Sequence, residues 1–183
     1  MVGREASMHM LSEQLQQYGR HWPEEKDVPH FIELLDGGEH RFRRESWEAH
    51  FTGSAWLVSA DGMRVLLTHH RKLGRWLQLG GHADGDTDLA RVALREAEEE
   101  SGITGLEVEA EPFDLDRHRI PARGAEPEHW HYDVRYVVRA VASEDFVVSD
   151  ESHALAWRSI REIAEDPQGD ESLRRMARKW LQR

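Results

Sequence analysis

The segment from residue 88 to residue 101 carries the strongest structural signal in the chain, and it predicts an α-helix. Its aliphatic residues recur at helical spacing and would form one apolar side: Leu89, Ala90, Ala93, Leu94 and Ala97. Gly102 stands where a left-handed residue ends a helix, and Ile103 supplies the hydrophobic residue that follows such an ending. An apolar side of this kind must be covered, so the helix is expected to pack on a sheet.

Segments with strand character lie on both sides of this helix. Before it, the expected strands are residues 54–59, 63–68 and 76–79, with Asp61-Gly62 as a hairpin turn between the first two. After it, the expected strands are residues 106–110, 113–120 and 129–141, followed by helices at 155–165 and 170–182. Strands around one strong helix, with another helix at the end, predict an α/β fold.

The first 45 residues differ from the rest and predict a helical N-terminal extension. One helix is expected from Ser7 to Gly19 and a shorter one from Pro29 to Leu35. The division that follows is an extension at 1–45 and a main domain at 46–183. The extension could cap a functional site or form a homodimer contact.

Composition excludes several classes of protein. The formal charge of −11 would repel a polyanion, so a nucleic acid polymer is not an expected partner. The absence of cysteine rules out disulfides, thiolate metal sites and a cysteine nucleophile. No apolar run is long enough for a membrane helix, and the N-terminus lacks the apolar stretch of a secretory signal. A cytoplasmic protein is therefore expected.

The acidic side of the predicted helix is the best candidate for chemistry. At about 100° per residue, Glu96, Glu99 and Glu100 fall in one sector at the edge of the apolar side. Carboxylate oxygens suit Mg²⁺, which proteins usually share with substrate phosphates. Arg95 is expected to reach Glu98 or Glu99 and orient a carboxylate. A solvated acidic surface is the alternative, and it is the commoner explanation of a Glu-rich helix.

The flanking residues favour the metal site, because together they resemble the Nudix box. The matching positions are Gly81, Arg95, Glu96, Glu99, Glu100, Gly102 and Ile103. Two positions depart from the pattern: Ala97 is small where a bulky aliphatic residue is usual, and Thr87 replaces the first glutamate. Thr87 or Asp86 could cap the helix instead. The Leu-Gly-Gly-His form of the box is similar to that of a prokaryotic subgroup whose substrates the motif does not fix.

The resemblance covers residues 50–165 and implies a Nudix-type α/β/α sandwich with a mixed sheet. It implies a pyrophosphohydrolase that uses Mg²⁺ or Mn²⁺ to cleave a small nucleoside diphosphate linked to a moiety X. Glu96, Glu99, Glu100 and the Gly81 carbonyl would be metal ligands, and Arg95 would orient the carboxylates. One glutamate, Glu99 or Glu100, could share the role of base. Glu151 is a candidate further ligand or base.

Several other residues are candidates for substrate contact. His82 follows the glycine of the box and should lie near the metals. His131 and Asp133 share one side of a strand with His129 and Arg135, which predicts either a substrate or second-metal contact or, more simply, a polar outer face. Arg119 and Arg123, together with Arg117, flank a loop and could bind phosphate. They could equally pair with neighbouring acids, namely Asp114, Asp116 and Glu126.

Two rival functions follow from the same residues. A Nudix-like sensor would bind a nucleotide or sugar without cleaving it, but such domains typically lose carboxylates of the box. Isopentenyl diphosphate isomerases share the Nudix fold, and the Gly81-His82 pair is similar to their metal-site region. They depend on a catalytic cysteine, which this chain lacks.

Overall fold

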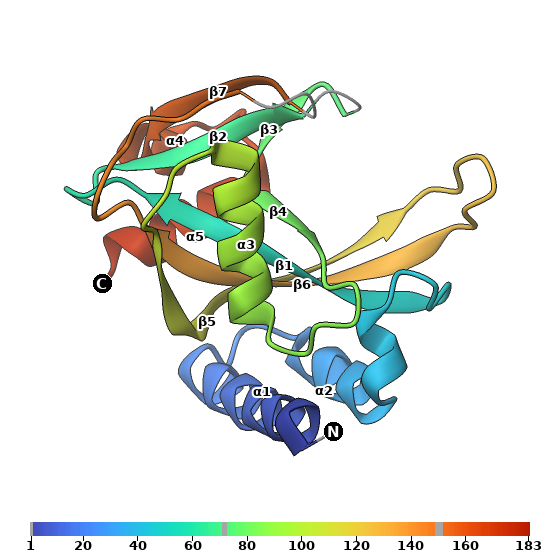
Figure 1. The fold of residues 1–183 in the computed structure, drawn as a ribbon. Helices are drawn as coiled ribbons and strands as arrows, with labels where there is room; N and C mark the ends of the chain where they lie inside the picture. The colour runs from blue at the N-terminus through green and yellow to red at the C-terminus, as the bar shows by residue number, and fades with distance from the viewer. Residues whose placement is uncertain (1, 71–72, 149–151) are drawn as a thin grey trace.

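The computed structural model describes residues 2–70, 73–148 and 152–183, and it places one mixed sheet between two groups of helices (Figure 1). The helices are α1 (Val2–His21), α2 (Val28–Asp36), the short 3-10 helix η1 (Glu39–Phe42), α3 (Leu89–Ser101), α4 (Ile160–Glu165) and α5 (Glu171–Leu181). The strands are β1 (Ala49–Val58), β2 (Arg64–His70), β3 (Arg75–Leu77), β4 (Leu79–His82), β5 (Glu107–Ile120), β6 (His129–Arg139) and β7 (Ser152–Ser159).

The seven strands form a mixed sheet because β1 runs parallel to β6, whereas the other pairs are antiparallel. The main path is β3-β2-β1-β6-β5, with β4 paired to β1 and β7 paired to β2. The hairpin predicted around Asp61-Gly62 exists, but β1 and β2 pair only at Val58 and Val65. Further along, β1 takes β4 as its neighbour. The α/β fold with a mixed sheet is confirmed.

Helix α3 forms as its sequence predicts. Asp88 caps its N-terminus, where the carboxylate accepts a hydrogen bond from the Arg91 backbone at 3.1 Å. Gly102 ends the helix with a left-handed φ of +69°, and Ile103 is buried behind it. The expected caps, Thr87 or Asp86, are wrong. Thr87 is buried, and Asp86 instead binds the Asp88 backbone N–H and the Arg91 side chain.

The helix predicted at 155–165 is half wrong. Residues 155–159 belong to β7, where Leu155 pairs with Thr68 and Ser159 with Arg64 of β2. The helix begins only at Ile160, after Ser159 caps it. Strand pairing with a distant segment overrides the local helical preference here. The two strands expected at 106–110 and 113–120 are a single strand, β5, whose register shifts between Val108 and Asp114.

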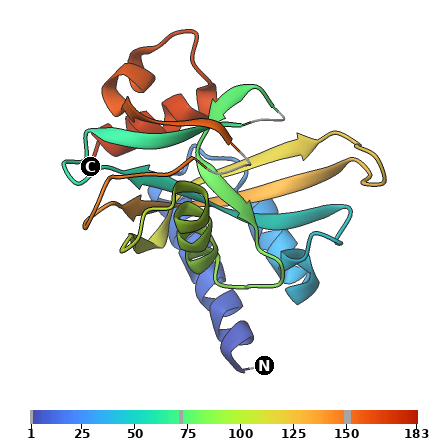
Figure 2. The same ribbon diagram turned by 45° about the horizontal axis from the view of Figure 1, so that its top comes forward.

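The N-terminal helices pack on the same side of the sheet as α3 (Figures 1 and 2). Leu15 and Phe31 are fully buried in one hydrophobic cluster with Phe51 of β1 and Leu89 of α3. Full burial of a side chain of this size contributes about 1.5–3 kcal/mol, so α1 and α2 add substantially to the core of the sheet. The boundary at residue 45 stays a prediction.

Helices α4 and α5 cover part of the opposite side of the sheet. Trp56 of β1 and Met176 of α5 are fully buried in a second hydrophobic cluster there. Successive residues of β1 alternate between the two clusters, with Ala55 and Leu57 facing α3 and Trp56 and Val58 facing α5. The layers are therefore helix, sheet and helix, as the resemblance implied. None of the helices in the described ranges is long and apolar enough to span a bilayer.

Candidate active site

The acidic side of α3 lies against the glycines of β4. A Cβ atom built on Gly81 would stand 2.3 Å from Oε2 of Glu96, so only glycine allows this carboxylate to approach the strand. Glu100 accepts a hydrogen bond from the Gly80 N–H at 3.5 Å. Glu99 is exposed beside them. Glu96 and Glu100 of the helix thus lie against the two glycines of β4.

Arg95 connects this side of the helix to the loop that precedes it. Its Nη2 atom donates to Oε1 of Glu96 at 2.9 Å and to the carbonyl oxygen of His82 at 3.0 Å. The expected partners, Glu98 or Glu99, are wrong, because the guanidinium binds Glu96 and the His82 carbonyl instead. Glu96 is partly buried, with 17% of its side chain exposed. One arginine therefore fixes a carboxylate and the strand end in a single arrangement.

The loop between β4 and α3 is held by the segment before β1. Arg44 makes a bidentate ion pair with Asp84, with both N–O distances at 2.7 Å. The Gly85 N–H donates to the Phe42 carbonyl at 2.7 Å. Asp84 has a positive φ of +52°, which is uncommon for a residue other than glycine. Contacts from outside the loop thus stabilise its shape.

The order of glycine, arginine and carboxylates agrees with a sequence profile that covers most of the chain. Residues 50–180 match the NUDIX domain. The chain belongs to the Nudix hydrolase family. As a Nudix hydrolase it is a pyrophosphohydrolase, and the family typically depends on divalent metal ions.

Solved structures of Nudix proteins share the fold at low sequence identity. A NUDIX-family hydrolase from Clostridium perfringens is 24% identical, with 73% of this chain and 96% of that chain covered and a TM-score of 0.57. An Ap4A hydrolase from C. elegans is 17% identical, with 72% and 95% covered and a TM-score of 0.54. The dihydroneopterin triphosphate pyrophosphohydrolase of E. coli is 17% identical, with 70% and 92% covered and a TM-score of 0.54. None of the curated proteins compared with the chain matches it.

Around the Nudix box, the side of β6 predicted as a polar outer face is buried, so that prediction is wrong. Asp133 and Arg135 are each only 2% exposed. Asp133 accepts hydrogen bonds from Thr52 at 2.9 Å and from Ser54 at 2.7 Å, and it forms an ion pair with Arg135 at 2.8 Å. Arg135 continues to Asp114, which is fully buried. The alternation along β6 agrees with the prediction, but α5 packs against Arg135 and β1 side chains bind Asp133, so the polar side is not an outer face.

The arginines near the β5–β6 loop mostly pair with acids. Arg119 is exposed and forms an ion pair with Glu128. Arg117 binds Asp27 of the N-terminal region at 3.0 Å. Arg123 is exposed, and its backbone N–H donates to the Glu126 carbonyl at 2.9 Å. Arg117 and Arg119 therefore pair with acids, as the alternative predicted. The acids are Asp27 and Glu128, not the expected Asp114, Asp116 or Glu126. Glu151 lies outside the described residues.

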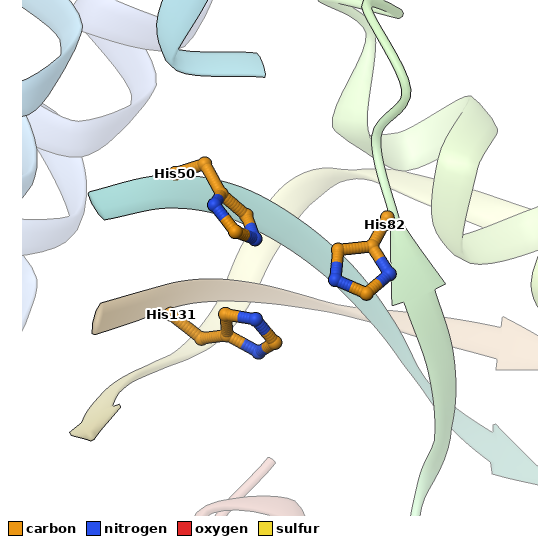
Figure 3. Close-up of side chains that lie close together, drawn as sticks. All are labelled: His50, His82 and His131. Carbon is orange, nitrogen blue, oxygen red and sulfur yellow. The ribbon is translucent and has the colours of Figure 1, made fainter. Parts of the chain in front are cut away.

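Three histidines from three neighbouring strands meet beside the box. His82 and His131 were candidates from the sequence, and His50 joins them because β1 pairs with β6 so that His50 faces His131 (Figure 3). Burial lowers the pKa of His50 to about 4 and the pKa of His131 to about 2, and it also lowers that of His82. All three imidazoles are therefore neutral at pH 7. No local pattern singles out His50, since only strand pairing brings it here.

Proposed function

We propose that this Nudix hydrolase cleaves the diphosphate linkage of a nucleoside diphosphate joined to a second moiety X, with Mg²⁺ or Mn²⁺ held by the carboxylates of α3. The observation that carries the proposal is the contact of Glu96 with Gly81, fixed by Arg95. This contact supports the proposal because the partly buried Glu96 carboxylate lies against β4, while Glu99 on the same helix is exposed. An acidic helix surface that is simply solvated does not require a contact between a carboxylate and a strand glycine.

The donor set fits a hard divalent cation. Glu96, Glu99 and Glu100 would supply carboxylate oxygens, and the Gly81 carbonyl is a further candidate, all of the type that Mg²⁺ prefers. When bound, the ion neutralises phosphate charge and favours ionisation of a water molecule. Arg95 orients the Glu96 carboxylate. One of the exposed or half-buried glutamates, Glu99 or Glu100, would accept the proton of the attacking water.

The remaining site assignments are part of the same proposal. Glu151 is retained as a further acidic ligand or base. His82 and His131 would line the substrate side of β4 and β6. Arg119, exposed near the end of β5, and Arg123, exposed on the β5–β6 loop, would meet a phosphate or an anionic X, and Arg119 would first have to leave Glu128. Asp133 would act by holding the strands in register, since Thr52, Ser54 and Arg135 already bind its oxygens.

A substrate panel tests the proposal directly. Nucleoside diphosphate sugars, dinucleoside polyphosphates, oxidised nucleotides and non-nucleotide diphosphates would be incubated with the protein and Mg²⁺ or Mn²⁺, and phosphate products measured. Glu99→Gln and Glu100→Gln should lower turnover by about 10²–10⁴-fold, the contribution of a positioned acid–base group. Glu98→Gln is the matched control, because Glu98 is exposed on the same helix and outside the box pattern.

The panel also separates the proposal from the sensor alternative. Tight binding of one compound with no turnover of any compound, at saturating metal, would indicate a sensor. Equal turnover of the wild type and both box variants would reject the assigned residues. A homodimer and a cytoplasmic location stay predictions.

A further inference from the structure

His50, at the start of β1, has one ring nitrogen without a role in the fold. Its Nδ1 atom lies 3.3 Å from the carbonyl oxygen of Ser46. A carbonyl can only accept, so the proton is on Nδ1 and the lone pair is on Nε2. That Nε2 atom is buried and has no hydrogen-bond partner among the residues that the structure describes. The whole residue is 1% exposed. A buried acceptor of this kind costs free energy unless something binds it.

The space around His50 is lined by further imidazoles. One ring nitrogen from each of His50, His82 and His131 lies within 4.8 Å of the others. The ring centroids are 5.3 Å apart for His50 and His82, 4.7 Å for His50 and His131, and 5.1 Å for His82 and His131. Figure 3 shows the three rings around one common space between their strands.

The strands hold these histidines in place. Residue 50 of β1 is paired with residue 131 of β6, and Thr52, two positions on, is paired with His82 of β4. All three side chains therefore rise from the same side of the sheet. The backbone of His82 is fixed in addition by the hydrogen bond from Arg95 at 3.0 Å. The pairing of the three strands therefore sets the positions of all three histidines.

A fourth histidine orients the third. Nδ1 of His129 lies 2.8 Å from the Pro127 carbonyl, so the proton is on Nδ1 and the lone pair is on Nε2. That Nε2 atom lies 3.2 Å from Nε2 of His131, which must then donate to it. The remaining lone pair of His131 is on Nδ1. Imidazoles that bind metals commonly donate their other N–H to a carbonyl or another acceptor, which is what His50 and His131 do.

We propose that His50, His82 and His131 form a second metal site, which binds a transition-metal ion such as Zn²⁺ and is distinct from the carboxylate site of α3. Neutral imidazole nitrogens suit Zn²⁺ and similar ions, whereas Mg²⁺ requires oxygen ligands. Tetrahedral coordination at 2.0–2.1 Å sets nitrogen atoms about 3.4 Å apart, so small ring rotations would close the present spacing. Three protein ligands leave a position open for water or a substrate oxygen.

The site goes beyond the proposed function and its test does not depend on turnover. Protein without a histidine tag would be stripped of metal and dialysed against Zn²⁺ in millimolar Mg²⁺, and bound zinc would be counted. We expect about one zinc ion per chain. The extended X-ray absorption fine structure of the bound zinc should show imidazole nitrogens at about 2.0–2.1 Å. A shell of oxygen only, or zinc that Mg²⁺ displaces, would overturn the proposal. This measurement uses the wild-type chain, so no variant has to fold.

Variants then locate the ion. His82→Gln and His131→Gln should each weaken zinc binding by at least about 100-fold, because even partners outside the metal shell are worth 10–100-fold. His9→Gln is the matched control, since the His9 side chain is 78% exposed on α1. Glu99→Gln should leave zinc affinity unchanged. If Glu99→Gln weakened zinc binding as much as His131→Gln, the zinc would belong to the carboxylate site and the proposal would fail.

Discussion

Arg44 and Asp84 form a bidentate ion pair, with both N–O distances at 2.7 Å, that joins the segment before β1 to the loop of the Nudix box. Arg44 lies outside the residues that match the NUDIX domain, which begin at residue 50. The Phe42 carbonyl, from the same segment, accepts a hydrogen bond from Gly85. The N-terminal region therefore supports the loop of the Nudix box as well as the hydrophobic core.

Arg44→Ala should reduce activity more than stability. The pair is about half exposed, so its loss should change the free energy of unfolding by no more than about 1 kcal/mol. The loop would lose a fixed partner, and we expect kcat/KM to fall by about 10-fold or more, since small misplacement of a site is costly. Arg4→Ala, which removes another exposed ion pair of the N-terminal region, is the control. Equal kinetics for Arg44→Ala and the wild type would contradict this role.

Gly81→Ala should displace Glu96. The added methyl group would stand 2.3 Å from the carboxylate, far inside contact distance. We expect weaker Mg²⁺ or Mn²⁺ binding, lost turnover and a decrease of about 1–3 kcal/mol in the free energy of unfolding from overpacking. Gly3→Ala is the matched control, because a Cβ atom there meets nothing within 4 Å. Metal titration and urea unfolding of both variants would check the prediction, and unchanged metal affinity in Gly81→Ala would refute it.

Arg95→Ala should weaken metal binding without unfolding the protein. It removes the hydrogen bonds to Glu96 and to the His82 carbonyl, so the carboxylate loses its orientation. Loss of an orienting partner typically lowers metal affinity by about 10–100-fold. Calorimetric titration with Mn²⁺ would measure this change. Arg178→Ala, an exposed arginine of α5 that pairs with Glu171, should bind Mn²⁺ as the wild type does.

Stability should fall steeply in acid because of Asp114. Burial by itself would raise the pKa of this carboxyl, but the hydrogen bonds from Arg175 and the charges of Arg135 and Lys179 outweigh burial and lower it. The unfolded chain therefore binds a proton at higher pH than the folded chain does. The stabilisation is present above the unfolded pKa of about 3.9 and is lost as the pH falls below it.

Asp114→Asn tests this account. The variant leaves buried positive charges without their partner, so the free energy of unfolding at pH 7 should fall by about 3–5 kcal/mol. Its stability should also depend less on pH between pH 5 and pH 2, as measured by urea unfolding across that interval. Glu98→Gln makes a similar change of charge at an exposed position and should keep the slope of the wild type. An equally steep slope in Asp114→Asn would place the acid sensitivity elsewhere.

The sequence alone determined the features that depend on neighbours in the chain. Helix α3, its apolar side, its left-handed end at Gly102 and the spacing of its glutamates all arise within a few residues. The alternation along β6 was equally readable, and so was the family to which the motif belongs. These features follow from the helical and strand periods and from the conformational freedom of glycine, which act locally.

The tertiary structure decided whatever depends on contacts between distant segments. Residues 155–159 became a strand because β2 pairs with them. On the polar side of β6, Arg135 became buried against Ser172 and Met176 of α5, and Asp133 against β1. His50 meets His131 only through the parallel pairing of β1 with β6, where contacts join residues 81 positions apart, as for Thr52 and Asp133. Periodicity states which side of an element a residue occupies, but packing determines what lies opposite that side.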